Sequence, residues 1–301
     1  MRSAWPKGAG STACVSVGYV TFFRCCSALL CWTLSQGAGV LRAADGPGAN
    51  EPENLRIEVT GSAWLVNSGG TIRAGGGSRV IPVITLVPII SFPTALDLVT
   101  DLGVNQRQPS FYGRLVVKPG WKHRIVIEGT PVTLHGTNVI TQTLIYQGQV
   151  FTIGQTLESS ATVNYLFGGY QYDVVSVPAG HLGFSVGGAY LNATGTIRGV
   201  ESRLVATKSE TVGLPLAGAE GRVFVIPGRK LLEIDGGVRG MAFGGYGHYV
   251  EETVNGGLAF GPLTIQAGYR AVSANLHTTT NGGNGVDVRL HGPIFSLQAR
   301  W

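Results

Sequence analysis

The stretch Arg289-Leu-His-Gly-Pro-Ile-Phe-Ser-Leu-Gln-Ala-Arg-Trp301 decides the fold, because its side chains alternate between two faces as those of a β-strand do. Phe295, Leu297 and Trp301 fall on an apolar face, while Gln298 and Arg300 fall on a polar one. About ten residues of a strand tilted near 45° cross the apolar band of a membrane. The stretch therefore predicts a membrane-spanning strand that closes with an aromatic residue.

The same alternation recurs along the chain, whereas helical periodicity is almost absent. In the segment 121–131, Arg124 and Glu128 share one parity, and Ile125 and Ile127 share the other. An even number of strands fits a barrel that the chain enters and leaves on one side. We predict an all-β, antiparallel up-and-down transmembrane barrel of about ten strands, with eight as the alternative. The ten candidate strands are 54–66, 109–118, 121–132, 157–173, 181–195, 212–226, 231–243, 247–260, 262–276 and 287–301.

A soluble β-sandwich would show the same alternation with its faces reversed, so other features must separate the two folds. Short turns link strand pairs, and longer connections lie between them, as in barrels with tight periplasmic turns and long outer loops. Aromatic residues lie close to the short turns, where a membrane interface needs them. These features favour a barrel in lipid over a soluble β-sandwich. The long connections are 67–109, 133–155, 196–212 and 277–286, and the expected membrane-interface aromatics are Trp121, Phe224, Phe260 and Trp301.

The polar faces of the candidate strands carry charges of both signs, which suits the interior of a narrow barrel. An unpaired charge there would be costly, so a neutralised network of ion pairs is the first expectation. A selectivity lining for small solutes is the functional alternative. The expected lumen-facing charged network comprises Arg56, Glu58, Arg114, Lys122, Arg124, Glu128, Glu220, Arg222, Glu233, Asp235, Arg239, Arg270 and Arg300.

Residues 1–44 differ chemically from the rest and predict a signal peptide that is removed on export. They hold all four cysteines and four basic residues but no acid. Their apolar core, 25–34, is too short to span a bilayer as a helix. Without them 18 basic and 17 acidic residues remain, a net charge of +1, so the chain offers no basic surface for nucleic acid. We expect export through the periplasm and a single barrel domain, 45–301, with a long outer loop at 67–109.

Five short segments together resemble a family of bacterial outer-membrane β-barrel proteins of uncharacterised function, small antiparallel barrels with a C-terminal aromatic residue. The segments are Leu96-Asp-Leu-Val-Thr-Asp-Leu-Gly103, Gly113-Arg-Leu-Val-Val-Lys-Pro-Gly-Trp-Lys-His-Arg124, Gly169-Tyr-Gln-Tyr-Asp173, Gln266-Ala-Gly-Tyr-Arg270 and the Trp301 end. The resemblance covers most of residues 45–301. It implies a fold and a location in the outer membrane, and it supplies no catalytic residues. The long first loop, which contains Gly and Pro, departs from the family pattern.

The sequence favours a non-enzymatic protein, either a structural or surface-loop barrel or a narrow, porin-like pore for small solutes. The expected partners are outer-membrane lipid, the barrel-assembly machinery through the last strand ending in Trp301, and small solutes or a surface ligand. No cofactor or metal is expected. His248 and Glu251 belong to a cluster of possible ligands that we expect at a solvated loop rim, but they differ in parity and would point to opposite faces of a strand. A membrane-embedded lipid hydrolase, built on His277 and His291, is the first alternative. A secreted soluble β-sandwich that acts as a binding module is the second.

Overall fold

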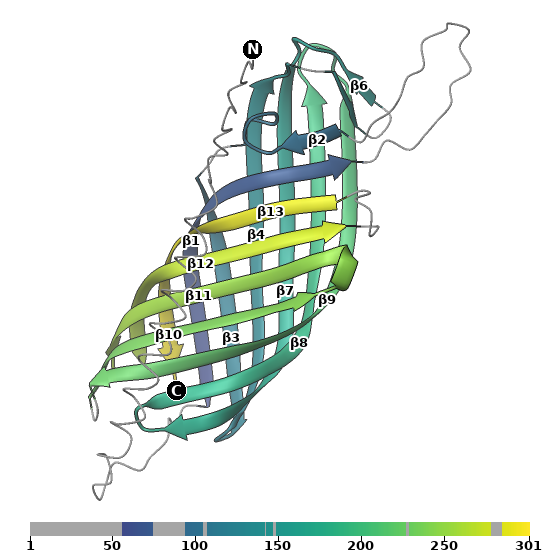
Figure 1. Cartoon of the computed structure of the whole chain (residues 1–301). Helices are drawn as coiled ribbons and strands as arrows, with labels where there is room; N and C mark the ends of the chain where they lie inside the picture. The colour runs from purple at the N-terminus through teal and green to yellow at the C-terminus, as the bar shows by residue number, and fades with distance from the viewer. Residues whose placement is uncertain are drawn as a thin grey trace, which may run out of the picture. The chain divides into compact units, whose positions relative to one another are not determined.

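Ten long strands, each antiparallel to its neighbours, form a closed barrel (Figure 1). The computed structural model describes residues 56–74, 94–104, 107–141, 143–146, 149–226, 229–277 and 285–301. The last strand pairs back onto the first from Glu58↔Arg300 to Arg73↔Gly285, which closes the sheet. The barrel strands are β1 (Ile57–Ala74), β3 (Gln108–Gly120), β4 (His123–Val139), β7 (Thr156–Val177), β8 (Gly180–Gly199), β9 (Val205–Ile226), β10 (Arg229–Ala242), β11 (Gly247–Phe260), β12 (Leu263–His277) and β13 (Gly285–Arg300).

The closed sheet confirms the predicted up-and-down barrel with ten strands, so the eight-strand alternative and the β-sandwich are wrong. The predicted signal peptide, 1–44, and the middle of the predicted outer loop, 75–93, lie outside the described residues. Within the described part of the chain, no helix has the length and apolar character needed to cross a membrane.

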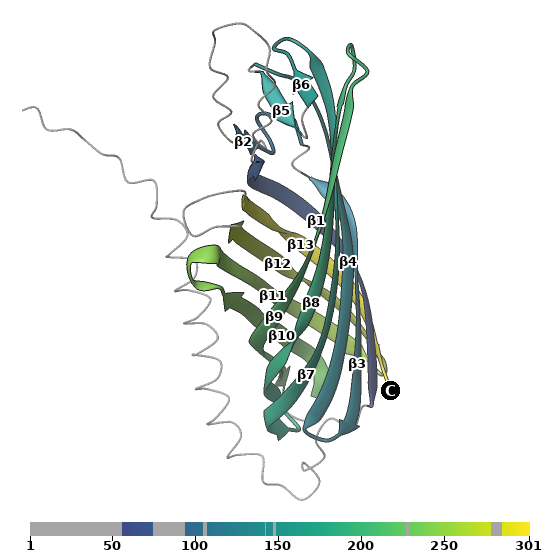
Figure 2. The same ribbon diagram turned by 90° about the vertical axis from the view of Figure 1, so that its right-hand side faces the viewer.

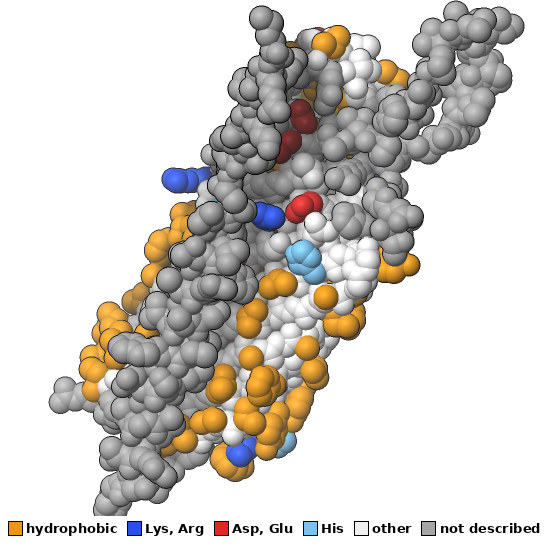
Figure 3. All heavy atoms as spheres, in the orientation of Figure 1, with side chains coloured by type: hydrophobic (Ala, Val, Ile, Leu, Met, Phe, Trp, Pro, Cys, Tyr) orange, Lys and Arg blue, Asp and Glu red, His pale blue; other side chains and the backbone are white. Residues whose placement is uncertain are grey.

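Apolar side chains cover the outside of the barrel and polar ones enter its interior, because successive residues of a strand point to opposite faces. Ile127 is 46% exposed, whereas the next residue, Glu128, is 1% exposed. Along β7, Phe167 and Gln171 point inward and Tyr170 points outward. Figure 3 shows hydrophobic side chains gathered over the outward face of the strands, with few charged side chains among them. This arrangement is the one expected of a barrel surrounded by lipid.

Four neighbouring strands, β4, β7, β8 and β9, rise beyond the others at the end of the barrel opposite the short turns (Figure 2). β9 pairs with β10 only from Ala217 onward, and β4 pairs with β3 only as far as Gly129. We call the parts of these four strands beyond those pairings the upper wall. The expected loops 133–155 and 196–212 are therefore partly strand. The expected loop 67–109 likewise contains the end of β1 and the short β2 (Thr94–Asp97), which pairs with β1.

Pro131 explains why β3 and β4 separate at Gly129. Proline has no N–H to donate to a neighbouring strand, so the regular ladder cannot continue through it. Two hydroxyl groups replace the missing bonds: Ser110 donates to the carbonyl oxygen of Pro131 at 2.5 Å, and Thr130 donates to that of Phe111 at 2.7 Å. The strands diverge here without leaving these carbonyl groups unpaired.

The inner face of the upper wall is covered by a cap, which we define as residues 97–104 together with the hairpin β5 (Leu144–Tyr146) and β6 (Gln149–Phe151). Ser159 donates to the carbonyl oxygen of Leu102 at 2.8 Å, and Asn138 donates to that of Thr100 at 2.6 Å. The cap and wall share one apolar cluster whose buried members include Leu98, Leu102, Val104, Leu134, Leu144, Phe151, Leu157 and Ile197. The cap therefore supplies the apolar partner that the risen strands lack.

A turn closed by Asp97 shapes the cap segment. The Asp97 carboxylate accepts backbone N–H bonds from Val99 and Thr100, both at 2.8 Å, and the Asp101 carboxylate accepts the N–H of Asp97 at 2.8 Å. The backbone N–H of Thr100 is the main cause that holds the pKa of Asp97 below its ordinary value.

We expect Gly136→Ala to displace the cap, because the added Cβ would overlap the carbonyl oxygen of Leu102. This contact lies beside the isolated β-bridge that Val104 forms with Gly136. Overpacking of this kind costs about 1–3 kcal/mol. Limited proteolysis should cleave residues 97–104 faster in this variant than in the wild type. Gly168→Ala is the matched control, since a Cβ at that strand glycine meets no atom within 4 Å. Equal cleavage of all three proteins would contradict the contact.

Candidate functional site

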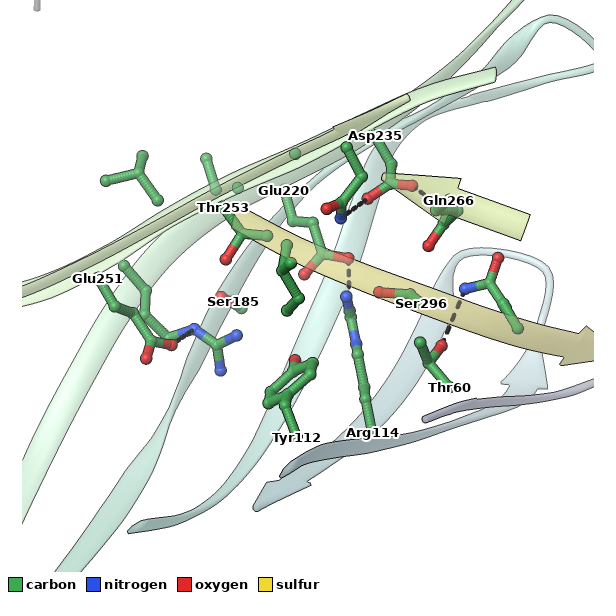
Figure 4. Close-up of a pocket in the computed structure, with 18 residues that line it drawn as sticks. Thr60, Tyr112, Arg114, Ser185, Glu220, Asp235, Glu251, Thr253, Gln266 and Ser296 are labelled. Carbon is green, nitrogen blue, oxygen red and sulfur yellow. Dashed lines mark hydrogen bonds and ion pairs between the residues drawn. The ribbon is translucent and has the colours of Figure 1, made fainter. Parts of the chain in front are cut away.

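The barrel interior holds a chain of ion pairs, with Glu128 at its centre. Arg239 donates to both carboxylate oxygens of Glu128 at 2.7 Å, and Nε of Arg114 lies 3.3 Å from Oε1. Arg114 also bonds Glu220, as Figure 4 shows. A carboxylate that is 1% exposed is therefore held between two guanidinium groups from β3 and β10. Charge-assisted bonds of this kind offset the cost of burying the ions.

Glu251 extends the network to the neighbouring strands. Its carboxylate lies 2.7 Å from Nε of Arg239 and 3.2 Å from Nη2 of Arg270. The hydroxyl groups of Tyr165 and Tyr249 each donate to it at 3.3 Å. Two cations and two hydroxyl groups thus share one buried carboxylate.

Aromatic rings fill the space around the arginines. The guanidinium carbon of Arg270 lies 4.2 Å from the ring centre of Tyr112 and 5.2 Å from that of Trp64. That of Arg239 lies 4.1 Å from the ring centre of Phe167. These cation–π contacts stabilise charge and exclude water at the same time.

A second layer of ion pairs lies toward the short-turn end. Arg222 bonds Glu58 at 2.9 Å, and Arg300 lies 3.6 Å from Glu58 while also bonding Glu233. Arg124 bonds Asp173 at 2.7 Å, with both side chains at most 3% exposed. Every interior glutamate of the two layers contacts an arginine, which makes the interior a neutralised network.

The structure brings all but two of the predicted lumen residues into the interior. Those that face inward are Glu58, Arg114, Arg124, Glu128, Glu220, Arg222, Glu233, Asp235, Arg239, Arg270 and Arg300. Arg56 is exposed just before β1, and Lys122 lies in the turn between β3 and β4. These two assignments are wrong because alternation applies only within a strand and carries no information in the residues that precede it or in a turn.

Phe224 is wrongly predicted as a membrane-interface aromatic. It is 3% exposed and lies opposite Glu233, on the inward face that it shares with Arg222. Phe224 shares its parity with Arg222, and this shared parity is the sequence signal that its side chain faces inward. Trp121, Phe260 and Trp301 point outward and are 60%, 57% and 59% exposed.

Glu251 and Asp173 are interior residues that the sequence analysis did not assign to the lumen. The expectation that Glu251 lies at a solvated loop rim is wrong: β11 begins at Gly247, so Glu251 faces inward and is 4% exposed. Its parity with Tyr249 and Asn255 is the signal in the sequence. Asp173 is recognisable by its parity with Gln171, which donates to it at 2.9 Å.

One small cavity interrupts the interior between the two layers. Its volume is about 40 Å³, and Arg114, Glu220, Asp235, Asn255 and Gln266 are among the residues that line it (Figure 4). Asn255 donates to Asp235 at 2.9 Å, and Gln266 donates to Glu233 at 2.9 Å. A polar space of this size has room for a few water molecules.

His291, one of the two histidines of the hydrolase hypothesis, faces outward from β13. Its Nδ1 lies 2.6 Å from the hydroxyl oxygen of Tyr269, and the two rings stack. The side chain of His277, the other histidine, lies outside the described residues. The hydrolase hypothesis stays a prediction.

No family model and no curated protein matches the chain. Among solved structures, it resembles the translocator domain of autotransporter NalP from Neisseria meningitidis, at 10% identity and a TM-score of 0.43, over 91% of this chain and 98% of that one. It also resembles Ail, the attachment invasion locus protein of Yersinia pestis, in complex with the heparin analogue sucrose octasulfate, at 9% identity and a TM-score of 0.34, over 82% of this chain and 100% of that one. A third match is the Pseudomonas putida toluene transporter TodX, at 7% identity and a TM-score of 0.34, over 86% of this chain and 91% of that one. Matches at these values carry no argument about this chain, and its family membership stays a prediction.

Proposed function

We propose that the protein is a non-enzymatic barrel of the bacterial outer membrane whose interior is sealed and whose upper wall and cap are presented at the cell surface. The observation that carries this proposal is the contrast between the two faces of each strand. Ion pairs and aromatic rings fill the inside, while apolar side chains cover the outside. A water-soluble barrel would lose free energy by exposing so much apolar surface, whereas a lipid-surrounded barrel gains it.

The level of the aromatic side chains supports a membrane orientation. Trp121, Phe260 and Trp301 lie at the short-turn end of the barrel, and all three point outward. Aromatic rings mark membrane interfaces because their bodies are apolar and their tips polar. We place the short turns in the periplasm and the upper wall outside the cell, with export through the periplasm and assembly through β13 by the barrel-assembly machinery.

The upper wall supports a surface role, since its outward face is polar and lies above the apolar band. Asn192 donates to Thr211 at 2.9 Å, and Thr196 and Thr207 share a hydrogen bond of 3.0 Å. Such a face suits water or saccharide and does not suit lipid tails. Outer-membrane lipid and a surface ligand are the partners that we propose, and nucleic acid is not among them.

A narrow pore for small solutes is the second candidate, because the interior cavity is polar. Planar-bilayer recordings separate the two functions. We expect no unitary current steps from the wild-type barrel, since each interior glutamate is bound to an arginine. The double variant Arg114→Ala/Glu220→Ala removes the pair between these residues and the contact of Arg114 with Glu128, leaves the net charge unchanged, enlarges the cavity and should conduct. Unitary steps of equal size from both proteins would contradict a sealed interior and identify a pore.

A further inference from the structure

A cluster of aromatic and cationic side chains lies on the outside of the barrel at its short-turn end. We define this turn cluster as Trp121, Lys122, His123, Tyr170 and Tyr172. Nζ of Lys122 lies 4.5 Å from the ring centre of Trp121 and 5.9 Å from that of Tyr172. Trp121 and Tyr172 are 60% and 41% exposed, so the rings that hold the lysine face outward. The ammonium group is therefore kept at the lipid-facing side of the turn.

The imidazole of His123 is fixed beside this lysine. Its Nδ1 lies 2.5 Å from the hydroxyl oxygen of Tyr170, and its ring centre lies 5.5 Å from that of Tyr172. When the tyrosine donates to Nδ1, the neutral ring carries its proton on Nε2 and presents a second donor. The turn itself is held by Ser176, whose hydroxyl donates to the carbonyl oxygen of Trp121 at 3.4 Å.

No carboxylate lies on the outward face of the described strands next to this turn. The outward residues there are Val117, Ile125, Ile127, Val174, Leu182 and Phe184. Asp173 is near in sequence, but it points inward, is fully buried and bonds Arg124 at 2.7 Å. Among the described residues, no carboxylate therefore lies on the side toward which the rings hold the ammonium group of Lys122.

We infer that the turn cluster binds the phosphate group of a phospholipid in the periplasmic leaflet of the outer membrane, an inference that rests on the proposed function. A cation, an imidazole N–H and the indole N–H of Trp121 offer donors to a phosphate oxygen. Rings exposed at this level require apolar surroundings, which acyl chains supply and a free phosphate ion does not. A lipid headgroup therefore matches both parts of the cluster.

Among the described residues, two other sites on the outer surface can be compared with the turn cluster. Lys230, the second residue of β10, lies 5.8 Å from the ring of Phe224, which faces inward. The pair formed by Tyr269 and His291 has the same hydrogen bond as Tyr170 and His123. Lys230 provides a matched control for a basic side chain at a short turn.

Native mass spectrometry of barrels released from nanodiscs tests the inference. The discs contain a glycolipid without phosphate as the bulk lipid, with a small fraction of either phosphatidylglycerol or diacylglycerol of the same acyl chains. We expect the wild type to retain phosphatidylglycerol and not diacylglycerol. Lys122→Ala should weaken retention about tenfold, because a charge-assisted bond is lost, while Lys230→Ala should leave it unchanged.

Three outcomes overturn the inference. Equal retention of the two lipids would mean that the phosphate is not recognised, and equal losses in both lysine variants would mean that the turn cluster is not the site. Displacement of the lipid by millimolar inorganic phosphate would mean that a free ion suffices. Failure of the wild type to insert into the discs contradicts the proposed function itself, whereas an inserted barrel that retains both lipids alike contradicts only the inference.

Discussion

Glu128→Ala is expected to lower the free energy of unfolding of the membrane-inserted barrel by about 3–5 kcal/mol. The substitution removes the carboxylate that Arg114 and Arg239 share, so Arg114 keeps only Glu220 and Arg239 keeps only Glu251 as a charged partner. Burial makes this loss large, because a buried cation that loses an anionic partner is poorly compensated by its surroundings. Urea unfolding in lipid vesicles, followed by tryptophan fluorescence, measures the change.

The matched control is Glu158→Ala, which breaks another glutamate–arginine pair of the same barrel. Glu158 and Arg198 lie 3.6 Å apart on the upper wall, and their side chains are 52% and 59% exposed. An exposed pair of this kind contributes about 0–1 kcal/mol. Similar losses in the two variants would show that the interior is wet and the network weak.

Ile127→Arg, at the residue before Glu128, is expected to destabilise the inserted barrel by about 2–4 kcal/mol, because it adds a charge on the outward face. Ile127 is 46% exposed and points outward, roughly 10 Å along the barrel axis from the short-turn end at the tilt of such strands. An arginine there must enter the apolar band. On the surface of a water-soluble protein, the same exposed substitution changes stability by only about 0.5 kcal/mol.

Thr137→Arg is the control for Ile127→Arg, because it lies on the outward face of the same strand but in the upper wall. We expect it to change the free energy of unfolding by less than about 0.5 kcal/mol. The same vesicle assay compares the two. If Ile127→Arg left the free energy of unfolding unchanged, this position would lie in water, and the lipid-facing surface would be contradicted.

The sequence predicts the barrel strands well because alternation is a local property of each strand. Ile127 and Glu128 differ in polarity where one faces out and the next faces in, and the same rule identifies Glu58, Arg222 and Arg300 as interior residues. The pairing of these charges could not be predicted, because Arg222 and Glu58 meet across the barrel and are far apart in the chain.

The strands run farther than the hydropathy pattern indicates. In the upper wall the outward face of β8 and β9 carries Asn192, Thr196, Thr207 and Thr211 instead of apolar residues, yet the backbone ladder continues through them. The pattern of apolar residues indicates where the lipid-facing surface would end. It does not indicate where the strand ends. The contact of Leu102 with Gly136 could not be predicted either, since an inward-facing glycine does not indicate which distant segment packs against it.

The most direct test of the account is the location of the protein and its migration on gels. Cells that express the full chain are fractionated into soluble, inner-membrane and outer-membrane material, and each fraction is run with and without boiling. We expect the protein in the outer-membrane fraction, resistant to extraction at high pH, and migrating faster before boiling than after, as a closed barrel does in detergent. A folded protein that stays in the soluble fraction without detergent would contradict a barrel whose apolar outer face meets lipid.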